Sequence, residues 1–335
     1  MDYIPIKDLL CEIGETICRN VHHSLKTQSI DRLSAVHKEG ADDTIYQIDK
    51  EVEGIIVPML EQYAEKLGGI VLIAEGIGET EKVVLPTSMT EKEAALQIIM
   101  DPIDGTRGIM YDKRPAFFLA GAAPNQPEAG LQDIEVAVMV ELPTSRSLFS
   151  DTLWAIKRQG AFAYTKNLET ENIQEKTIRP SQSDTIYGGF AQIARFFPPG
   201  REVLAAVEEA MLEKIFPDAP EGKTIVFEDQ YISSGGQLYE ILMGHDRFVA
   251  DIRAALFDKM KKEGKKIGHV CHPYDVCAIL IGQEAGVIIT DIRGNPLNYP
   301  LDTTSPVNWV AYANEKIQQQ VEPAFKEALE AYKII

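Results

Sequence analysis

The chain has 335 residues, of which 45% are hydrophobic and 25% are charged, as is usual for a globular protein with a substantial core. Its formal net charge of −18 argues against a general affinity for nucleic acid or anionic membranes. No signal peptide and no apolar run of membrane-spanning length is apparent, so the expected location is the cytoplasm. The four cysteines fit no usual zinc spacing and are expected to be reduced, buried thiols.

The first third of the chain predicts two amphipathic helices followed by two strands. Apolar residues recur at helical spacing from Ile6 to Leu25 and again from Ile45 to Leu60. Residues 69–74 then predict a buried strand that leads directly into Glu75. After a polar excursion over residues 77–93, the apolar run at 96–100 predicts a second buried strand.

Strands and helices continue to alternate through the rest of the chain. Strands are predicted at residues 117–123, 134–142, 148–149, 153–157, 161–164, 287–290 and 308–313. Residues 233–236 are typical of a helix N-terminus with a serine cap, and further helices are predicted at 276–285 and 317–332. Residues 121–133 and 192–230 are interpreted as insertions that could shape a pocket or an interface.

This interleaving, without any internal repeat, indicates an α/β protein built from mixed α+β layers. We expect the whole chain, residues 1–335, to form a single unit with two sub-halves. The N-terminal part, about 1–180, is expected to be an α+β part that binds metal, and the C-terminal part, 181–335, is expected to be α/β.

The most informative motif is Asp-Pro-Ile-Asp-Gly-Thr at residues 101–106, directly after the strand at 96–100. Two carboxylates three residues apart at the end of a strand can converge on one point, and Gly105 lets the backbone approach a ligand closely. Thr106 adds a hydroxyl and a main-chain N–H. An Asp-Gly turn alone would carry no information, but the full string after a strand suits a Mg²⁺-assisted phosphate site.

Three further acids could join Asp101 and Asp104. Glu75 also follows a strand directly, Asp275 stands at the expected start of a helix, and Asp49 lies within the second helix. Each acid taken singly is more often a solvated or capping residue. The placement of Glu75 and Asp275 at the ends of elements favours a role for these two in the site.

Together with Tyr274-Asp275-Val276-Cys277-Ala278 and Glu284-Ala285-Gly286-Val287, this motif resembles the inositol monophosphatase family of Mg²⁺-dependent, Li⁺-sensitive phosphatases. The order of motifs agrees from about residue 38 to 313. The resemblance implies a layered αβαβα sandwich that hydrolyses a small phosphorylated metabolite, such as an inositol or sugar phosphate, by metal-activated water. It also implies two or three Mg²⁺ ions per site and a homodimer, while the negative charge argues against a nucleic acid or membrane partner.

The resemblance further assigns roles in the chemistry to named positions. Glu75, Asp101 and the Ile103 carbonyl would hold the first metal ion. Asp101, Asp104 and Asp275 would hold the second. Thr106, polarised by Asp49, would hold and help deprotonate the attacking water on the first metal ion. Glu75, Thr106 and Asp49 are the expected catalytic set.

The remaining roles concern the substrate. The N–H groups of Gly105 and Thr106 would receive the phosphate, and Lys38 would lie in a loop near the site. Gly235 and Gly236, after Ser234, would line the substrate pocket. Asp251 is the candidate for the acid that contacts the sugar in the inositol enzymes, while Lys113, Arg114 and Arg253 are expected at the surface.

Departures from the family pattern leave the substrate open. Gly76 stands where the family often has a second Glu, for which Glu79 could compensate, and Gly108 is reminiscent of the 3′-phosphoadenosine phosphatases. The alternatives are therefore a 3′(2′),5′-bisphosphate nucleotidase or a fructose-1,6-bisphosphatase. A non-enzymatic role with RNA or the transcription machinery is a further alternative, which the full set of acids and the negative charge disfavour.

Overall fold

The computed structural model of the protein describes residues 1–39, 44–78 and 80–335. For residues 37–39, 44–47, 49–51 and 53 it describes the backbone without the side chains. Glu79 and the side chains of Lys38 and Asp49 therefore lie outside the described part of the chain, and the roles expected of them stay predictions.

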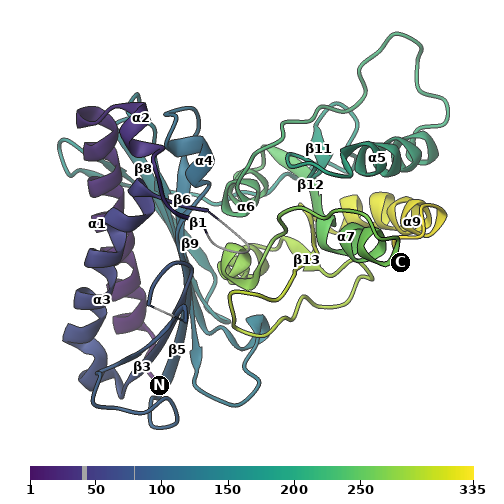
Figure 1. Ribbon diagram of the computed structural model, residues 1–335. Helices are drawn as coiled ribbons and strands as arrows, with labels where there is room; N and C mark the ends of the chain where they lie inside the picture. The colour runs from purple at the N-terminus through teal and green to yellow at the C-terminus, as the bar shows by residue number, and fades with distance from the viewer. Residues whose placement is uncertain (40–43, 79) are drawn as a thin grey trace.

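The elements follow one another in the order that Figure 1 shows. The helices of the described residues are α1 Ile4–Thr27, α2 Ile30–Leu33, α3 Gln47–Leu67, α4 Thr106–Ile109, η1 Leu131–Asp133, α5 Arg201–Ile215, α6 Ser234–Leu242, α7 Arg253–Lys262, η2 Pro273–Val276, α8 Ile279–Glu284 and α9 Glu315–Ala331, where η marks a 3₁₀ helix. The strands of the described residues are β1 Val36–Glu39, β2 Thr44–Tyr46, β3 Ile70–Ala74, β4 Lys82–Leu85, β5 Leu96–Asp104, β6 Ala116–Pro124, β7 Val136–Leu142, β8 Phe149–Ile156, β9 Ala161–Asn167, β10 Ile173–Lys176, β11 Phe190–Ile193, β12 Asp246–Asp251, β13 Ile288–Thr290 and β14 Trp309–Tyr312.

Two sheets organise the molecule. Within the described residues, eight strands form the larger sheet in the order β10-β9-β8-β7-β6-β5-β3-β4, and four form the smaller sheet in the order β11-β12-β14-β13. In the larger sheet β3 and β5 are parallel neighbours, with Ala74 opposite Met100. The next residue of each strand is an acid, Glu75 or Asp101, so this register brings two predicted site residues to adjacent positions.

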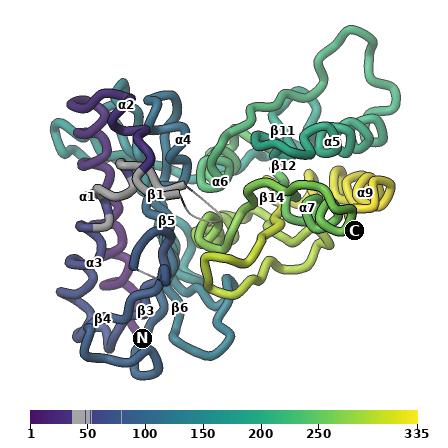
Figure 2. Tube along the Cα trace, in the orientation of Figure 1, coloured from purple at the N-terminus to yellow at the C-terminus, as the bar shows by residue number. Residues whose placement is uncertain are grey.

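Helices cover the sheets in layers (Figure 1). Helix α1 packs on α3 and on β6, β7 and β8, while α6 and α8 contact strands of both sheets and lie between them. Helices α5, α7 and α9 lie on the far side of the smaller sheet, away from α1 and α3 (Figure 2). The order of layers is therefore helix, sheet, helix, sheet, helix, which confirms the predicted mixed α+β sandwich.

Three apolar cores correspond to these layers. One lies between the α1–α3 pair and the larger sheet, one between the two sheets, and one beneath α5, α7 and α9. The helical spacing of Ile6, Leu10, Ile13 and Ile17 explains the first core, because these side chains are all buried on one face of α1. The four cysteines are buried free thiols, as predicted.

Several predicted element boundaries are wrong. Thr44–Tyr46 pairs with β1, so the second helix begins at residue 47 rather than 45. Residues 121–124 belong to β6 in the middle of the larger sheet, so the predicted insertion 121–133 begins within a strand of that sheet. Residues 190–193 form β11, so the predicted insertion 192–230 begins within a strand of the smaller sheet. Strand β4 within the polar excursion, strand β12 and helix α7 were all missed. The apolar centre of β12 is only three residues long, between Arg247 and Asp251, which is too short to stand out in the sequence.

The described part of the chain has no helix that is both long and apolar enough to cross a membrane. The division of the chain near residue 180 stays a prediction.

Candidate metal centre

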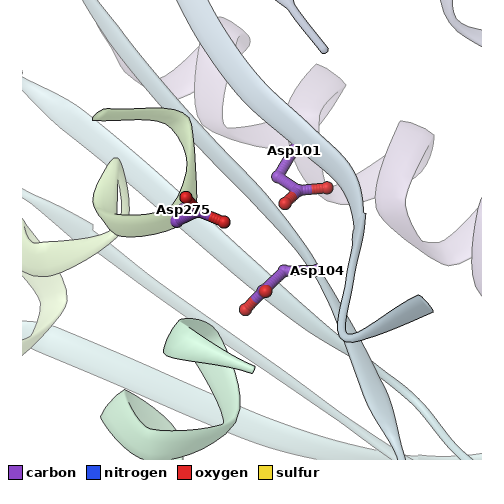
Figure 3. Close-up of side chains that lie close together, drawn as sticks. All are labelled: Asp101, Asp104 and Asp275. Atoms are coloured by element: carbon purple, nitrogen blue, oxygen red, sulfur yellow. The ribbon is translucent and has the colours of Figure 1, made fainter. Parts of the chain in front are cut away.

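Three carboxylates meet at the end of β5. One side-chain oxygen from each of Asp101, Asp104 and Asp275 lies within 4.8 Å of the other two. Figure 3 shows the three side chains close together. Asp101 and Asp104 come from the end of β5, and Asp275 comes from η2, far along the chain. The sequence predicted this convergence.

A bulge in β5 explains how residues three apart reach one face of the sheet. Asp101 lies opposite Leu119 and Asp104 opposite Phe117, so three steps along β5 match two steps along β6. In a regular strand residues three apart point to opposite faces, and one extra residue restores them to the same face. Pro102 lies inside this bulge, where a strand tolerates the loss of its N–H.

Backbone and side-chain donors hold the first two carboxylates in place. Asp101 Oδ1 accepts a hydrogen bond from the Ile103 N–H at 2.9 Å. Asp104 Oδ2 accepts from the Ser233 hydroxyl at 2.8 Å and from the Gly235 N–H. Because Ser233 also caps α6, accepting from the Gly236 N–H at 2.7 Å, the start of α6 is tied to the end of β5. The predicted serine cap is thus confirmed.

Asp275 is positioned differently from its prediction. Residues 276–285 do not form one helix that begins at Asp275, since the chain first makes the 3₁₀ helix η2 and only then α8. Pro273 at the first position of η2 starts this tighter turn early. Asp275 Oδ2 accepts from the His272 N–H at 2.6 Å, which directs the carboxylate back toward the start of η2.

Burial raises the pKa of two of the acids. Burial, followed by the nearby charges of Asp104, Glu75 and Asp275, raises the pKa of Asp101 well above its ordinary value. Burial raises the pKa of Asp104 to about 6, although its hydrogen bonds oppose the change. These two side chains are only 4% and 6% exposed. Buried carboxylates that repel one another in this way are a site where a cation is favourable.

The acids line an open cleft with about 450 Å³ of space, counted out to the solvent. Its lining includes Glu75, the three aspartates, Ile103, Gly105 and Thr106. The Thr106 hydroxyl donates to the Ile103 carbonyl at 2.8 Å. Gly105 has a φ of +96°, and a side chain there would meet Ser233, so the turn after the aspartates requires glycine.

Other predicted site residues lie elsewhere. Gly235 and Gly236 are buried behind Asp104 and are not among the residues that line the cleft. Asp251 is 0% exposed and is bound by Arg253, which makes it a poor stand-in for an acid that contacts a sugar. The expectation that Arg253 lies at the surface is wrong, since it is 2% exposed and is one of the residues that line the cleft. Lys113 is exposed and Arg114 is partly exposed, bound to Asp229.

Sequence reasoning missed several other residues that line the cleft. Phe196, Phe197, Arg107, Ser233 and His269 all line the cleft. The two consecutive phenylalanines were placed in an insertion. Two aromatic residues side by side in an otherwise polar loop were the available signal, because exposed apolar groups often mark a binding site.

The chain matches the model of the inositol monophosphatase family over residues 6–191. Among solved structures, it is similar to the extragenic suppressor protein SuhB of Bartonella henselae, with 16% identity, 96% of this chain and 99% of that chain covered, and a TM-score of 0.66. It is also similar to an IMPase of Thermotoga maritima, with 17% identity, 97% and 98% coverage and a TM-score of 0.57. It is similar, too, to the holo form of a Leishmania major fructose-1,6-bisphosphatase, with 12% identity, 97% of this chain and 93% of that chain covered, and a TM-score of 0.64. No curated protein sequence is significantly similar to the chain.

Proposed function

The chain belongs to the inositol monophosphatase family, and we propose that it is a Mg²⁺-dependent phosphomonoesterase acting on a small phosphorylated metabolite. The observation that carries the proposal is the convergence of Asp101, Asp104 and Asp275 beside Glu75 in an open cleft. The similar structures include an IMPase and a fructose-1,6-bisphosphatase, which supports the reaction class.

The donor set fits a hard divalent cation. All of the groups are oxygens and two of the carboxylates are buried. Their pKa values are raised first by burial, and for Asp101 also by the neighbouring acids, and a bound cation would offset both effects. Glu75, Asp101 and the Ile103 carbonyl would hold one ion, and Asp101, Asp104 and Asp275 would hold another. Bound Mg²⁺ supplies positive charge to the phosphoryl oxygens and lowers the pKa of water.

The chain's own groups would position water and phosphate. The Thr106 hydroxyl is oriented by its bond to the Ile103 carbonyl, and a hydroxyl that donates one hydrogen bond can also accept another. We propose that it accepts from the attacking water, with Glu75 orienting the same water and Asp49 polarising the hydroxyl. The N–H groups of Gly105 and Thr106, at the turn that Gly105 makes possible, would receive the phosphate.

Groups farther from the phosphate would act indirectly or through charge. Lys38 would bring a positive charge toward the phosphate. Gly235 and Gly236 would act through Asp104, because the Gly235 N–H binds that carboxylate and a side chain at Gly235 would lie 2.8 Å from it.

Mg²⁺-dependent phosphate release tests the proposal. The panel contains inositol 1-phosphate, fructose 1,6-bisphosphate, 3′-phosphoadenosine 5′-phosphate and histidinol phosphate. We expect Asp104→Asn to lose at least about 100-fold in kcat/KM, since even outer-sphere partners of a metal cost 10- to 100-fold. Asp184→Asn is the matched control, because Asp184 is an exposed acid paired with Lys316 outside the cleft. Equal activity in wild type and Asp104→Asn would overturn the proposal.

Two further properties follow from the family resemblance. We propose that Li⁺ inhibits the activity and that the protein forms a homodimer. Titration of Li⁺ against phosphate release tests the first, and light scattering of the purified protein tests the second.

A further inference from the structure

Part of the lining of the cleft is aromatic. The rings of Phe196 and Phe197 have their centroids 4.9 Å apart and are nearly perpendicular, at 85°. Both side chains are partly buried and both line the cleft. His269, which also lines the cleft, packs edge-on against Phe197 at 5.7 Å.

The segment that carries these rings is firmly held. Just before it, the Ala194 N–H donates to the Ala250 carbonyl at 2.8 Å, which continues the pairing of β11 with β12. Arg195 forms ion pairs with Glu208 and with Glu228. Just after it, residues 198 and 199 are prolines, which restrict the backbone. The rings therefore form a preformed surface, which saves the cost of ordering a flexible loop on binding.

Two guanidinium groups lie over the rings. The Cζ of Arg253 is 4.3 Å from the centroid of Phe196, and the Cζ of Arg107 is 5.1 Å from that of Phe197. Arg253 is held from the other side by Asp251 and by the His269 carbonyl at 3.1 Å. The charge of Asp251 is therefore paired with that of Arg253, and its buried side chain is not part of the lining of the cleft. Asp251 thus does not offer a carboxylate to the hydroxyl groups of a polyol.

Two of the hydroxyl groups of the cleft are also engaged within the protein. Ser233 binds Asp104 and the Gly236 N–H, and Ser234 Oγ lies 3.7 Å from Cys271 Sγ. A polyol needs many directed hydrogen bonds, because its hydroxyls lose water when they are buried. A planar aromatic group can instead pack edge-to-face or offset against a phenylalanine ring, and the two phenylalanines supply such rings.

We propose that Phe196 and Phe197 form the subsite for the leaving group, and that the substrate is a phosphomonoester whose alcohol carries a planar aromatic ring. This inference rests on the proposed function. In the reaction, the oxygen of water bonds to phosphorus as the ester P–O bond breaks. The products are inorganic phosphate and the free alcohol, whose oxygen takes up a proton from that water.

The experiment compares pairs of esters that differ in the ring alone. Benzyl phosphate is paired with cyclohexylmethyl phosphate, which has a similar leaving alcohol but a puckered ring. Adenosine 5′-monophosphate is paired with ribose 5-phosphate, which lacks the base, so the two pairs distinguish a simple aryl group from a nucleobase. Inositol 1-phosphate represents the polyols. Phosphate release with Mg²⁺ gives kcat/KM for each ester.

We expect wild type to prefer the aromatic member of at least one pair by about 3- to 10-fold, the range that an aromatic contact adds beyond burial. Phe196→Leu and Phe197→Leu keep an apolar side chain and should bring that ratio close to one. Phe190→Leu is the control, because Phe190 is a partly exposed ring on β11 outside the lining of the cleft. A ratio of two esters on one sample does not depend on how much of a variant is folded.

The outcomes separate the two proposals. A preference that both cleft variants lose and the control keeps supports the aromatic subsite. Hydrolysis of the esters without a preference for the ring, or with a preference that the variants retain, overturns the subsite and leaves the phosphatase. Absence of Mg²⁺-dependent release from every ester overturns the proposed function and the subsite with it.

Discussion

Asp104→Asn is expected to stabilise the metal-free protein while it abolishes activity. Burial raises the pKa of Asp104 to about 6, from the ordinary value of 3.8. This difference of about 2 pKa units corresponds to about 3 kcal/mol, by which the charged carboxylate destabilises the fold at neutral pH and above. Asparagine removes the charge but weakens the hydrogen bonds from Ser233 and Gly235, which offsets about 1–2 kcal/mol. The net gain should be about 1–2 kcal/mol.

The charge of Asp104 destabilises the fold by an amount that depends on pH. A carboxyl whose pKa is higher in the fold than in the unfolded chain binds its proton more tightly in the fold. Its contribution therefore lowers the stability of wild type as the pH rises through about 4 to 6, and the loss persists above that range. From the two pKa values, the charge penalty at about pH 5 is roughly half of that at about pH 8. Asp104→Asn should lack this dependence.

Urea unfolding followed by circular dichroism, in excess EDTA at both pH values, measures the difference. Saturating Mg²⁺ should reverse the order, because a bound ion stabilises wild type by about 2.7 kcal/mol at 100 times its Kd. Asp184→Asn, the exposed control, should change the free energy of unfolding by less than about 0.5 kcal/mol. If Asp104→Asn is less stable than wild type in EDTA at the higher pH, or if the difference is the same at both, the electrostatic reasoning is wrong.

Three further predictions concern glycines and the buried ion pair. Gly14→Ala should lower the free energy of unfolding by about 1–3 kcal/mol, because the new methyl would lie 2.6 Å from side chains of β6 and β7. Gly54→Ala, on α3 with no neighbouring atom within 4 Å, should raise the free energy of unfolding by about 0.5–1 kcal/mol. Urea unfolding measures both, and equal effects would contradict the packing. Gly105→Ala should reduce kcat/KM by at least about tenfold, because the φ of +96° at residue 105 is strained for alanine and this residue directly follows the aspartates. An unchanged kcat/KM would show that the turn adapts to alanine. Arg253→Met and Asp251→Leu should each destabilise by about 3–5 kcal/mol, and the double variant should recover part of this, as thermal unfolding would reveal; additive losses would refute the pairing.

The fold class could be predicted because the apolar periods are long and regular. The spacing in α1 and the continuous apolar runs of β3 and β5 each indicate one element, and their alternation indicates layers. Short elements escaped this reasoning. Strand β12 has an acid at each end and a short apolar centre, and its place in the sheet comes from its pairing with β11 and β14.

The candidate site also contains residues that the sequence could predict and residues that it could not. Asp101 and Asp104 could be found because one strand and one turn carry both, and Glu75 because it ends the neighbouring strand. The aromatic residues of the cleft were not found, because Phe196 follows a strand that joins the other sheet, and two consecutive phenylalanines do not show which cleft they line. Arg253 and Asp251 are two residues apart, but their burial and pairing depend on the packing of α7 against the smaller sheet.

By itself the sequence identified the acids at the end of β5 and the glycine and threonine that follow, since one strand and one turn carry them. Only the tertiary structure decided what faces them. Apolar periodicity shows which side of an element is buried, but not which other element covers it. Packing of α6 and η2 between the two sheets brings Ser233 to Asp104 and places Asp275 beside Asp101. The tertiary structure also places Phe196 and Phe197 in the lining of the same cleft as the acids, and so decides the surface against which a substrate would bind.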